Sequence, residues 1–287
     1  MSEGLLTPAP VLPPPGQRFG AGWLGRRFGW TRSSYTIMSV FIAVLLLIVI
    51  VWWPLVQQYA ASYDLAYPFW QQFDWLLLGI FLVMSLLIMY GADLKTDSWI
   101  VLVGMAGGLV IESWGTQTRL WSYFTFERPP LWIIPAWSIA SLAIDRLVRF
   151  LKRLPWLPLR VEQGVYWLIF LPFFILLFAF VRPTLDKPMT WLALLAVALI
   201  ILSPTDYRLA VLTFIAGSGL GYFLEVWGTT RACWTYYTLL TPPPFAVFAH
   251  GLAAVAFWRA GLILARFRGL ALAALPVPGW LKKVVNP

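Results

Sequence analysis

The sequence has 287 residues, of which 60% are hydrophobic and only 11% are charged, whereas a soluble domain carries about 25% charged residues. Long apolar runs with so few charges exclude an ordinary soluble domain and predict membrane-spanning helices, because lipid offers no partner to exposed backbone groups. The net charge of +9 comes from dispersed basic residues beside the apolar runs, which favours contact with anionic lipid over nucleic-acid binding. We therefore predict an all-α polytopic membrane protein without a nucleic-acid partner.

The counts of cysteine and histidine limit the metal and redox chemistry of the chain. Cys233 is the single cysteine and His250 the single histidine, so an intramolecular disulfide, a cysteine metal cluster and a multi-histidine site are excluded. The sequence also contains no phosphate-binding loop and no nucleophile motif. We expect neither a metal nor a cofactor.

Residues 1–34 are predicted to form a cytoplasmic leader. Thr7–Gly16 is rich in proline and should be extended, since it has little to bury. Gly20–Arg32 combines arginines with aromatic residues, which suits the surface of a membrane. We expect no cleaved signal peptide, because the first apolar run is long enough to span and no small-residue cleavage site follows it.

Eight apolar segments follow the leader, and we expect each to be a membrane-spanning helix. They are Tyr35–Val56, Trp75–Tyr90, Trp99–Ser113, Leu131–Phe150, Val165–Val181, Met189–Leu202, Leu209–Val226 and Phe245–Leu264. The third and the sixth are shorter than the roughly 20 residues that a bilayer requires. These two are predicted to be tilted or partly re-entrant.

The distribution of basic residues predicts the orientation of the spans. With the N-terminus inside, 16 of the 21 lysines and arginines lie in inner segments, as the positive-inside rule requires. We therefore predict a protein integral to the plasma (inner) membrane, with both termini in the cytoplasm.

The stretch from Gly108 to Arg146 occurs twice, and its second copy runs from Gly221 to Arg259. Between positions 107 and 146, 14 of 40 aligned pairs are identical without a gap, where chance would give about 3. Eight spans then make two four-helix repeats, residues 35–151 and 164–265, joined by a basic linker at 152–163 and followed by a tail at 266–287. An even number of spans in each half makes the repeats parallel.

Glu112 and Glu225 occupy equivalent places near the outer ends of their predicted helices. A charge at membrane depth is unfavourable, and the negative end of the helix dipole adds to this, so we expect protonated acids that can donate a proton. The alternative is a structural role, with each acid bonded to headgroup water or to a neighbouring helix end. Two acids at equivalent places favour a shared central site.

Aromatic and hydroxyl residues follow each glutamate at the same spacing. The candidate substrate-binding residues are Trp114, Thr116, Trp121, Tyr123, Trp227, Thr229, Trp234 and Tyr236. Such residues suit an aromatic pocket for a flat or cationic apolar group, and the alternative is an ordinary interfacial belt of tryptophan and tyrosine. Gly115 and Gly228 are predicted to be left-handed caps that end their helices.

His250 stands where the first half has Trp137, and its place in the last span predicts an approach to Glu225. An acid–imidazole pair would exchange protons, so Glu112, Glu225 and His250 are the candidate catalytic residues. The alternative for His250 is a satisfied structural histidine. Asp145 is predicted to pair with the adjacent Arg146.

Two further acids match between the halves. Asp93 and Asp206 each precede an apolar run, a position typical of a helix N-cap.

The segment Glu112-x-x-Gly115-Thr116-x-Thr118, with Tyr123, Pro130 and Pro135-Ala136-Trp137, resembles bacterial integral-membrane carotenoid-biosynthesis proteins of the carotenoid hydratase type. More distantly it is similar to the small membrane lycopene cyclase domains. The resemblance covers the repeat cores and implies an isoprenoid ligand. The chain has Thr118-Arg119 and Trp121-Ser122 where that family has Thr-Gly and Phe-Gly. A different membrane family with the same Glu…Gly-Thr…Trp-x-Tyr layout is the alternative.

Three functions remain open from the sequence. The first is binding or acid-catalysed transformation of an apolar membrane lipid or isoprenoid, because protonating a double bond needs a neutral acid in a dry aromatic pocket. The second is a small proton- or cation-coupled transporter, which the scarcity of polar residues in the spans disfavours. The third is a non-catalytic membrane scaffold or pigment-holding subunit. Assembly as a homo-oligomer also stays open.

Overall fold

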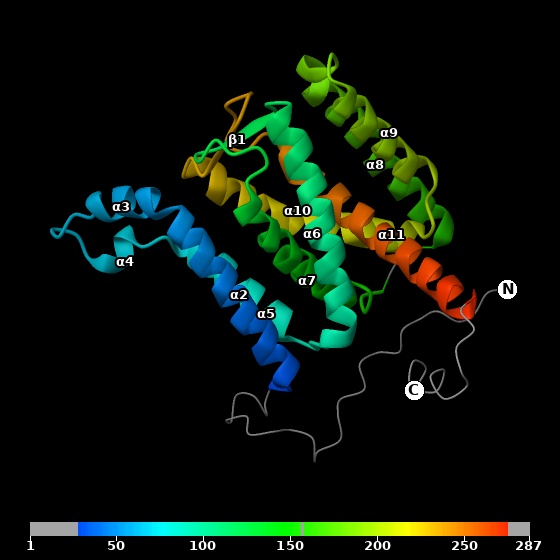
Figure 1. Ribbon diagram of the computed structural model, residues 1–287, viewed down its shortest axis with the longest axis horizontal. Helices are drawn as coiled ribbons and strands as arrows, with labels where there is room; N and C mark the ends of the chain where they lie inside the picture. The colour runs from blue at the N-terminus through cyan, green and yellow to red at the C-terminus, as the bar shows by residue number, and fades with distance from the viewer. Residues whose placement is uncertain (1–27, 156–157, 275–287) are drawn as a thin grey trace.

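The structure, a computed structural model, describes residues 28–155 and 158–274 (Figure 1). Its described residues form ten α-helices, two short 3-10 helices and a two-stranded ribbon. The α-helices are α2 (Arg32–Val51), α3 (Trp53–Ala61), α4 (Phe69–Gln72), α5 (Trp75–Met89), α6 (Leu94–Gln117), α7 (Ile134–Leu151), α8 (Leu159–Val181), α9 (Pro188–Leu202), α10 (Tyr207–Thr230) and α11 (Pro244–Ala274). The other elements are β1 (Trp121–Tyr123), η2 (Leu131–Ile133), η3 (Arg182–Thr184) and β2 (Trp234–Tyr236).

Six helical segments are long and apolar enough to cross a membrane. They are α2, α6, α7 with η2, α8 with η3, α10 and the first 24 residues of α11, whereas α5 and α9 are apolar but have only 15 residues each. These helices and the composition are those of a polytopic membrane protein, so the predicted class is confirmed. The predicted leader and tail lie mostly outside the described residues, and the linker lies partly outside them.

The third apolar segment is longer than the sequence predicted. This segment forms the 24-residue α6, which begins at Leu94 and not at Trp99. The helix begins early because Asp93 accepts hydrogen bonds from the backbone N–H groups of Lys95 and Thr96 and so caps its first turn. Asp206 caps α10 in the same way through Leu209. Both predicted N-caps are confirmed. The two short apolar helices are therefore α5 and α9, and not the third and sixth predicted segments.

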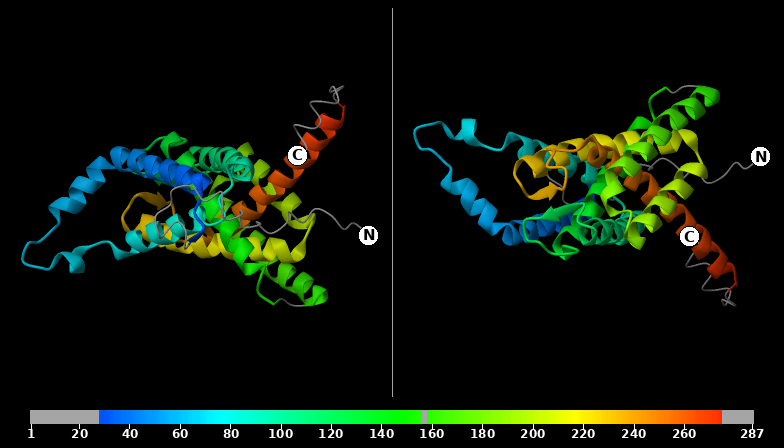
Figure 2. Two further views of the ribbon diagram at one scale, coloured as in Figure 1. Left: turned by 90° about the horizontal axis from the view of Figure 1, so that it is seen from below. Right: turned by 90° about the horizontal axis from the view of Figure 1, so that it is seen from above.

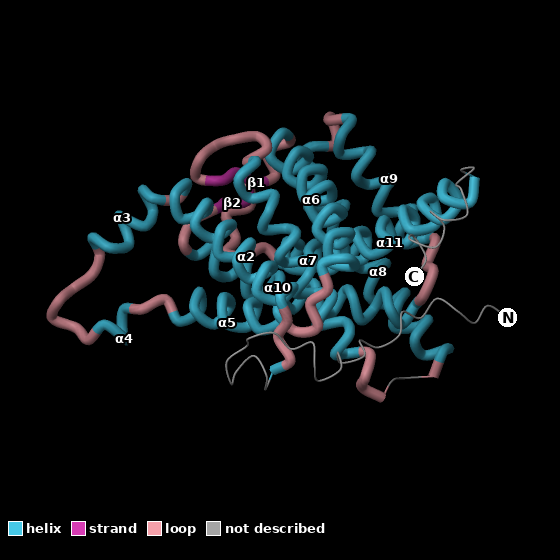
Figure 3. Tube along the Cα trace, turned by 60° about the horizontal axis from the view of Figure 1, so that its bottom comes forward, coloured by secondary structure: helices cyan, strands magenta, loops and turns pink. Residues whose placement is uncertain are grey.

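Four helices form the centre of the molecule. Helix α6 packs against α7 and α11, and α10 packs against α11 and α7, with α2 and α5 on one side and α8 and α9 on the other (Figure 1). Helices α3 and α4 extend away from this bundle, and the end of α11 projects in another direction (Figure 2). The ribbon lies among helices at one end of the bundle (Figure 3).

The duplication of the sequence is repeated in the boundaries of the elements. Helices α5 and α9, helices α6 and α10, and strands β1 and β2 begin and end at equivalent positions of the two halves, all under the offset that takes Gly108 to Gly221. Equal bounds at equal offset mean that the two segments fold alike locally.

Small residues let the central helices approach closely. A Cβ atom added at Gly104 would lie 3.0 Å from the Cα of Ser138 on α7, and one added at Gly217 would lie 2.7 Å from the carbonyl oxygen of His250 on α11. Side chains larger than hydrogen would therefore separate α6 from α7 and α10 from α11. Because of this close contact, side chains of α6, α7, α10 and α11 line one common cavity.

Arginines on α7 and α11 bind the ends of the two short helices. Arg146 donates to the carbonyl oxygen of Tyr90 at 3.1 Å, and Arg259 donates to a carbonyl in the last turns of α9. The predicted pair between Asp145 and Arg146 is confirmed. Arg146 also has a buried partner that no sequence pattern indicated, which is Asp97 at 2.7 Å.

Candidate functional site

The ribbon brings equivalent aromatic residues of the two chain segments together. Strands β1 and β2 are antiparallel, with Trp121 opposite Tyr236 and Tyr123 opposite Trp234. Residues two apart on a strand face the same side, and the rings of each opposed pair lie 6.0 and 5.9 Å apart. The four rings therefore form one aromatic face.

Glu112 lies under this face with both carboxylate oxygens bonded. Oε2 accepts a hydrogen bond from Nε1 of Trp121 at 3.0 Å, and Oε1 accepts from the hydroxyl of Tyr123 at 2.8 Å. The third donor is Nε1 of Trp137 on α7, 3.0 Å from Oε1. Glu112 is 2% exposed, so these protein donors replace the water that a buried carboxylate lacks.

Glu225 has the corresponding environment in the second half of the chain. Nε1 of Trp234 donates to Oε2 at 3.0 Å, and the hydroxyl of Tyr236 donates to Oε1 at 2.9 Å. The third contact joins Oε1 to Nε2 of His250 at 2.9 Å. The predicted approach of His250 to Glu225 is confirmed, while a catalytic role for the pair stays a prediction.

The phenols of the ribbon are hydrogen-bond donors. Burial, and next the Glu112 carboxylate, raise the pKa of Tyr123 well above its usual value, and burial and Glu225 do the same for the pKa of Tyr236. Both hydroxyls therefore keep their protons at any physiological pH. An indole N–H is a donor only, so Glu112 is surrounded by three donors and both of its oxygens accept hydrogen bonds.

The prediction that glycine caps end the two helices is wrong. Helices α6 and α10 continue through Gly115 and Gly228, and positive φ values fall on Arg119 and Ala232 instead. The glycines have a packing role, because an added Cβ would lie 1.8 Å from the ring of Trp121 at Gly115 and 1.9 Å from that of Trp234 at Gly228. Without a side chain at these places, each indole lies close enough to its helix to reach the carboxylate.

The two threonines among the candidate substrate-binding residues bond to backbone and do not line the cavity. Thr116 and Thr229 donate to the backbone carbonyls of Glu112 and Glu225, each at 2.6 Å. Each hydroxyl therefore bonds the turn that carries a glutamate and leaves the glutamate side chain to the aromatic donors.

Trp114 and Trp227, two residues after the glutamates, also do not donate to their carboxylates. Nε1 of Trp114 lies 3.4 Å from Oγ1 of Thr190 on α9. Trp227 donates to Asp74 at 2.8 Å and stacks on Trp52. Trp114 lines the cavity beside the carboxylates, and Trp227 does not.

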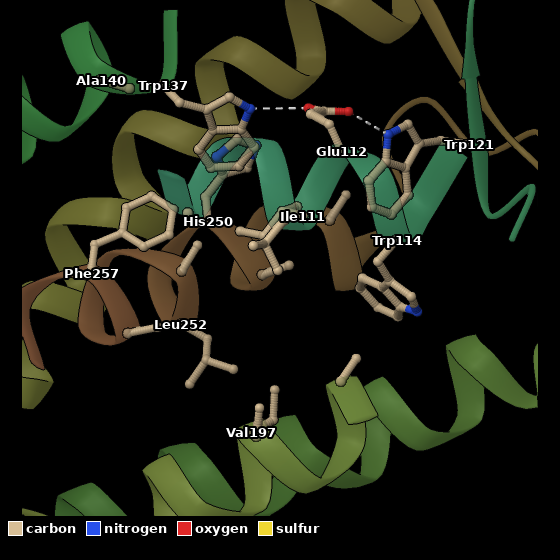
Figure 4. Close-up of a pocket in the computed structure, with 18 of the residues that line it drawn as sticks. Ile111, Glu112, Trp114, Trp121, Trp137, Ala140, Val197, His250, Leu252 and Phe257 are labelled. Atoms are coloured by element: carbon tan, nitrogen blue, oxygen red, sulfur yellow. Dashed lines mark hydrogen bonds between the residues drawn. The ribbon is translucent and has the colours of Figure 1, made fainter. Parts of the chain in front are cut away.

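A cavity of about 550 Å³ lies beside the two carboxylates, within the usual range for ligand sites. Helices α6, α7, α8, α9, α10 and α11 line it, mostly with alanine, valine, leucine, isoleucine and aromatic side chains. Glu112, Trp121, Trp137 and His250 lie along one side of it, and Val197 on α9 lies across from them (Figure 4). Glu225 and its two aromatic donors also line it. The site therefore combines a long apolar space with one polar, hydrogen-bonded wall.

The cavity lining extends along α11 and includes exposed side chains. Its lining residues on α11 run from Phe245 to Leu264, a length of about 28 Å at 1.5 Å per residue. Leu264 and Val110 both line it and are 46% and 69% exposed. Both residues belong to candidate spans, so part of the cavity lining is exposed on the surface of these two helices.

Trp137 belongs to the candidate site although sequence reasoning did not select it. Its indole donates to Glu112 and stacks on the ring of His250, with centroids 5.4 Å apart and planes at 18°. Its alignment with His250 across the duplication was the signal that could have identified it. Gly108 and Gly221 were also missed, and an added Cβ at either would lie 2.5 Å from Trp137 or His250, respectively.

No protein-family model, curated protein sequence or solved structure matches the chain. In the described residues, no group of three or more histidine, cysteine, aspartate or glutamate side chains could hold a metal ion.

Proposed function

We propose that this membrane protein binds an elongated apolar lipid or isoprenoid in the cavity and that Glu225 and His250 carry out acid–base chemistry on it. The observation that carries the proposal is an acid–imidazole pair, a buried Glu225 joined at 2.9 Å to a partly buried His250, in the lining of an apolar cavity. Ionisable groups at membrane depth are rare and mark functional sites more often than structural ones.

The shape of the cavity supports a chain-like ligand that comes from the bilayer. Its lining extends along about 28 Å of α11, and its side chains are apolar except at the end that holds the carboxylates. A membrane-dissolved hydrocarbon can enter beside the exposed side chain of Val110 without crossing water. A carotenoid-like isoprenoid has this length and this lack of polar groups.

The polar wall supports proton transfer to a carbon–carbon double bond. An imidazole side chain can serve as a general acid or base, and Nε2 of His250 lies 2.9 Å from Oε1 of Glu225. In this reaction a proton passes from the protonated imidazole to one alkene carbon, and aromatic faces stabilise the positive charge at the other. A water molecule then gives its hydroxyl to that carbon and returns a proton to His250, so the product is an alcohol and the protonated imidazole is regenerated.

The resemblance of the Glu112 segment to carotenoid-biosynthesis proteins of the hydratase type agrees with this chemistry and belongs to the same proposal. We further propose eight spans in two parallel four-helix repeats, with α5 and α9 as the short pair. The constant offset that relates α5 to α9 and α6 to α10 supports this arrangement. The excess of basic residues in the inner segments supports cytoplasmic termini.

A second function, holding a lipid or pigment without changing it, is favoured by the environment of Glu112. Both of its oxygens already accept bonds from protein donors, so this acid is fully engaged by the protein itself. In a protein that only binds the ligand, both carboxylates would serve to hold the aromatic side chains of the ribbon in position.

Mass spectrometry of the organic extract from gently purified protein distinguishes the two functions. We expect the wild type to contain a long-chain isoprenoid together with its hydrated product, and Glu225→Gln to contain the unreacted isoprenoid alone. The same unaltered isoprenoid in both proteins would support the holder. Ordinary phospholipid alone in both would contradict the proposal.

A further inference from the structure

A continuous row of contacts connects the two carboxylates through the interior. Oε1 of Glu112 accepts from Nε1 of Trp137, the Trp137 ring stacks on His250, and Nε2 of His250 contacts Oε1 of Glu225. The four residues come from α6, α7, α11 and α10, respectively. Figure 4 shows Trp137 lying over His250 with its ring nitrogen directed at Glu112.

We propose that Trp137 is a positioning residue through which Glu112 sets the orientation of the His250 imidazole. The significance of this for catalysis rests on the proposed function, but the coupling itself is a property of the unliganded protein. Glu112 then has a role in the duplicated site without donating a proton to a ligand. The two halves of the chain act as one site.

Geometry gives the indole of Trp137 little freedom. Its ring nitrogen is bonded to a carboxylate that Trp121 and Tyr123 also hold, and its inner edge lies against Gly108, where an added Cβ would come within 2.5 Å. A stacked ring whose own position is fixed restricts rotation of its neighbour about the bond that would swing Nε2 away from Glu225. Stacked aromatic pairs prefer a narrow range of offsets.

A competing path runs through the ribbon. Trp121, which bonds Glu112, lies against Tyr236, which bonds Glu225. A change at Glu112 could therefore reach His250 by way of Glu225 without involving Trp137. The test must separate these two paths.

His250 is the only histidine in the chain, so protein labelled with ¹⁵N,¹³C-histidine gives a single imidazole spin system in detergent micelles, apart from any affinity tag. We expect Trp137→Phe to move the His250 ring protons downfield, because the stacked indole no longer shields them, and to weaken the preference for a proton on Nε2. Trp121→Phe is the matched control, since it removes one indole donor from Glu112 on the side away from His250. It should leave the imidazole signals near their wild-type positions.

A double-mutant cycle gives the decisive comparison. Glu112→Gln should move the His250 signals in the wild-type background and should move them little further in the Trp137→Phe background. An equal shift in both backgrounds, or no shift in the wild-type background, would overturn the proposal. If Glu112→Gln does not fold, the single variants decide: an equal effect of Trp121→Phe and Trp137→Phe on His250 would exclude Trp137 as the connection. None of these results depends on a ligand, so they are independent of the extract experiment.

Discussion

The environments of Glu112 and Glu225 differ at one contact within an otherwise matching geometry. Each carboxylate accepts a tryptophan N–H on one oxygen and a tyrosine hydroxyl on the other. The third partner is Trp137 for Glu112 and His250 for Glu225. An indole can only donate, whereas an imidazole can donate or accept. The two carboxylate environments thus match in two of three contacts, and only the Glu225 environment contains a side chain that can either donate or accept at the third.

The two halves differ again at the inner side of the bundle. Arg146 on α7 is paired with buried Asp97, whereas the equivalent of Asp97 in the second half is Ala210. Arg259 is the equivalent of Arg146. Among the described contacts it donates to the carbonyl oxygen of Ile200 on α9 and to the hydroxyl of Ser203, and it has no carboxylate partner there. The first half thus carries an additional buried ion pair, and its removal should have the largest effect on stability.

Asp97→Ala should lower the free energy of unfolding by about 4 kcal/mol, because Arg146 would remain buried without its main partner. Thermal unfolding in detergent measures this loss. The control is Asp145→Ala, which removes a partly exposed partner of the same arginine and should change stability by about 1 kcal/mol or less. Equal losses in the two variants would contradict a special role for the Asp97 pair.

Gly228→Ala should lower stability by about 3 kcal/mol, since the new methyl group would overlap the ring of Trp234 and push it from Glu225. Gly115→Ala should have a similar effect through Trp121. The matched control is Gly219→Ala on the same helix as Gly228, where an added Cβ meets nothing within 4 Å, and alanine there should be neutral or stabilising. Intrinsic tryptophan fluorescence during unfolding reports all three, and equal losses at Gly228 and Gly219 would contradict the packing role.

Glutamine in place of the two glutamates tests the difference between them directly. At Glu112 the amide NH₂ must face an indole N–H whichever way it turns, because Trp121 and Trp137 lie on opposite oxygens. At Glu225 the amide oxygen can accept from Trp234 while its NH₂ donates to the hydroxyl of Tyr236 and to His250. We expect Glu112→Gln to cost about 2 kcal/mol from the unpaired donor and Glu225→Gln to be nearly neutral.

A rescue is expected from the same difference. Trp137→His would place an acceptor beside the amide of Glu112→Gln, so the double variant should lose less stability than the two single losses added together. Additive losses measured in the same unfolding assay would show that the indole donor is not the cause of the asymmetry.

Substitution of Cys233 should change stability least, because the equivalent residue in the first half is a buried leucine. Cys233 is 3% exposed and matches Leu120, and burial raises the pKa of its thiol to about 12. Maleimide at pH 8 should therefore label the folded protein more slowly than the unfolded protein, by on the order of ten-fold or more. Cys233→Leu should change stability by less than about 1.5 kcal/mol. Rapid labelling of the folded protein would contradict this packing.

Periodicity and duplication predicted the membrane class, the region of the site and the approach of His250 to Glu225. They could not predict the role of Gly115, because a glycine beside a helix end has the same sequence signal whether it caps the helix or makes room for an indole. The sequence pattern around Glu112 also could not show which side chains donate hydrogen bonds to its carboxylate. Trp121 and Tyr123 reach it through the ribbon and Trp137 through α7 packing, and both depend on contacts between segments far apart in the chain.

The cavity beside the carboxylates is proposed to hold a long apolar molecule. The most direct test compares lipids that co-purify with the wild type and with Ala256→Trp, whose side chain would fill the cavity. Leu192→Trp, on an exposed position of α9 outside the lining, is the control. We predict one long-chain apolar species in wild type and control and its loss from Ala256→Trp. The same species in equal amount in all three folded proteins would contradict the claim.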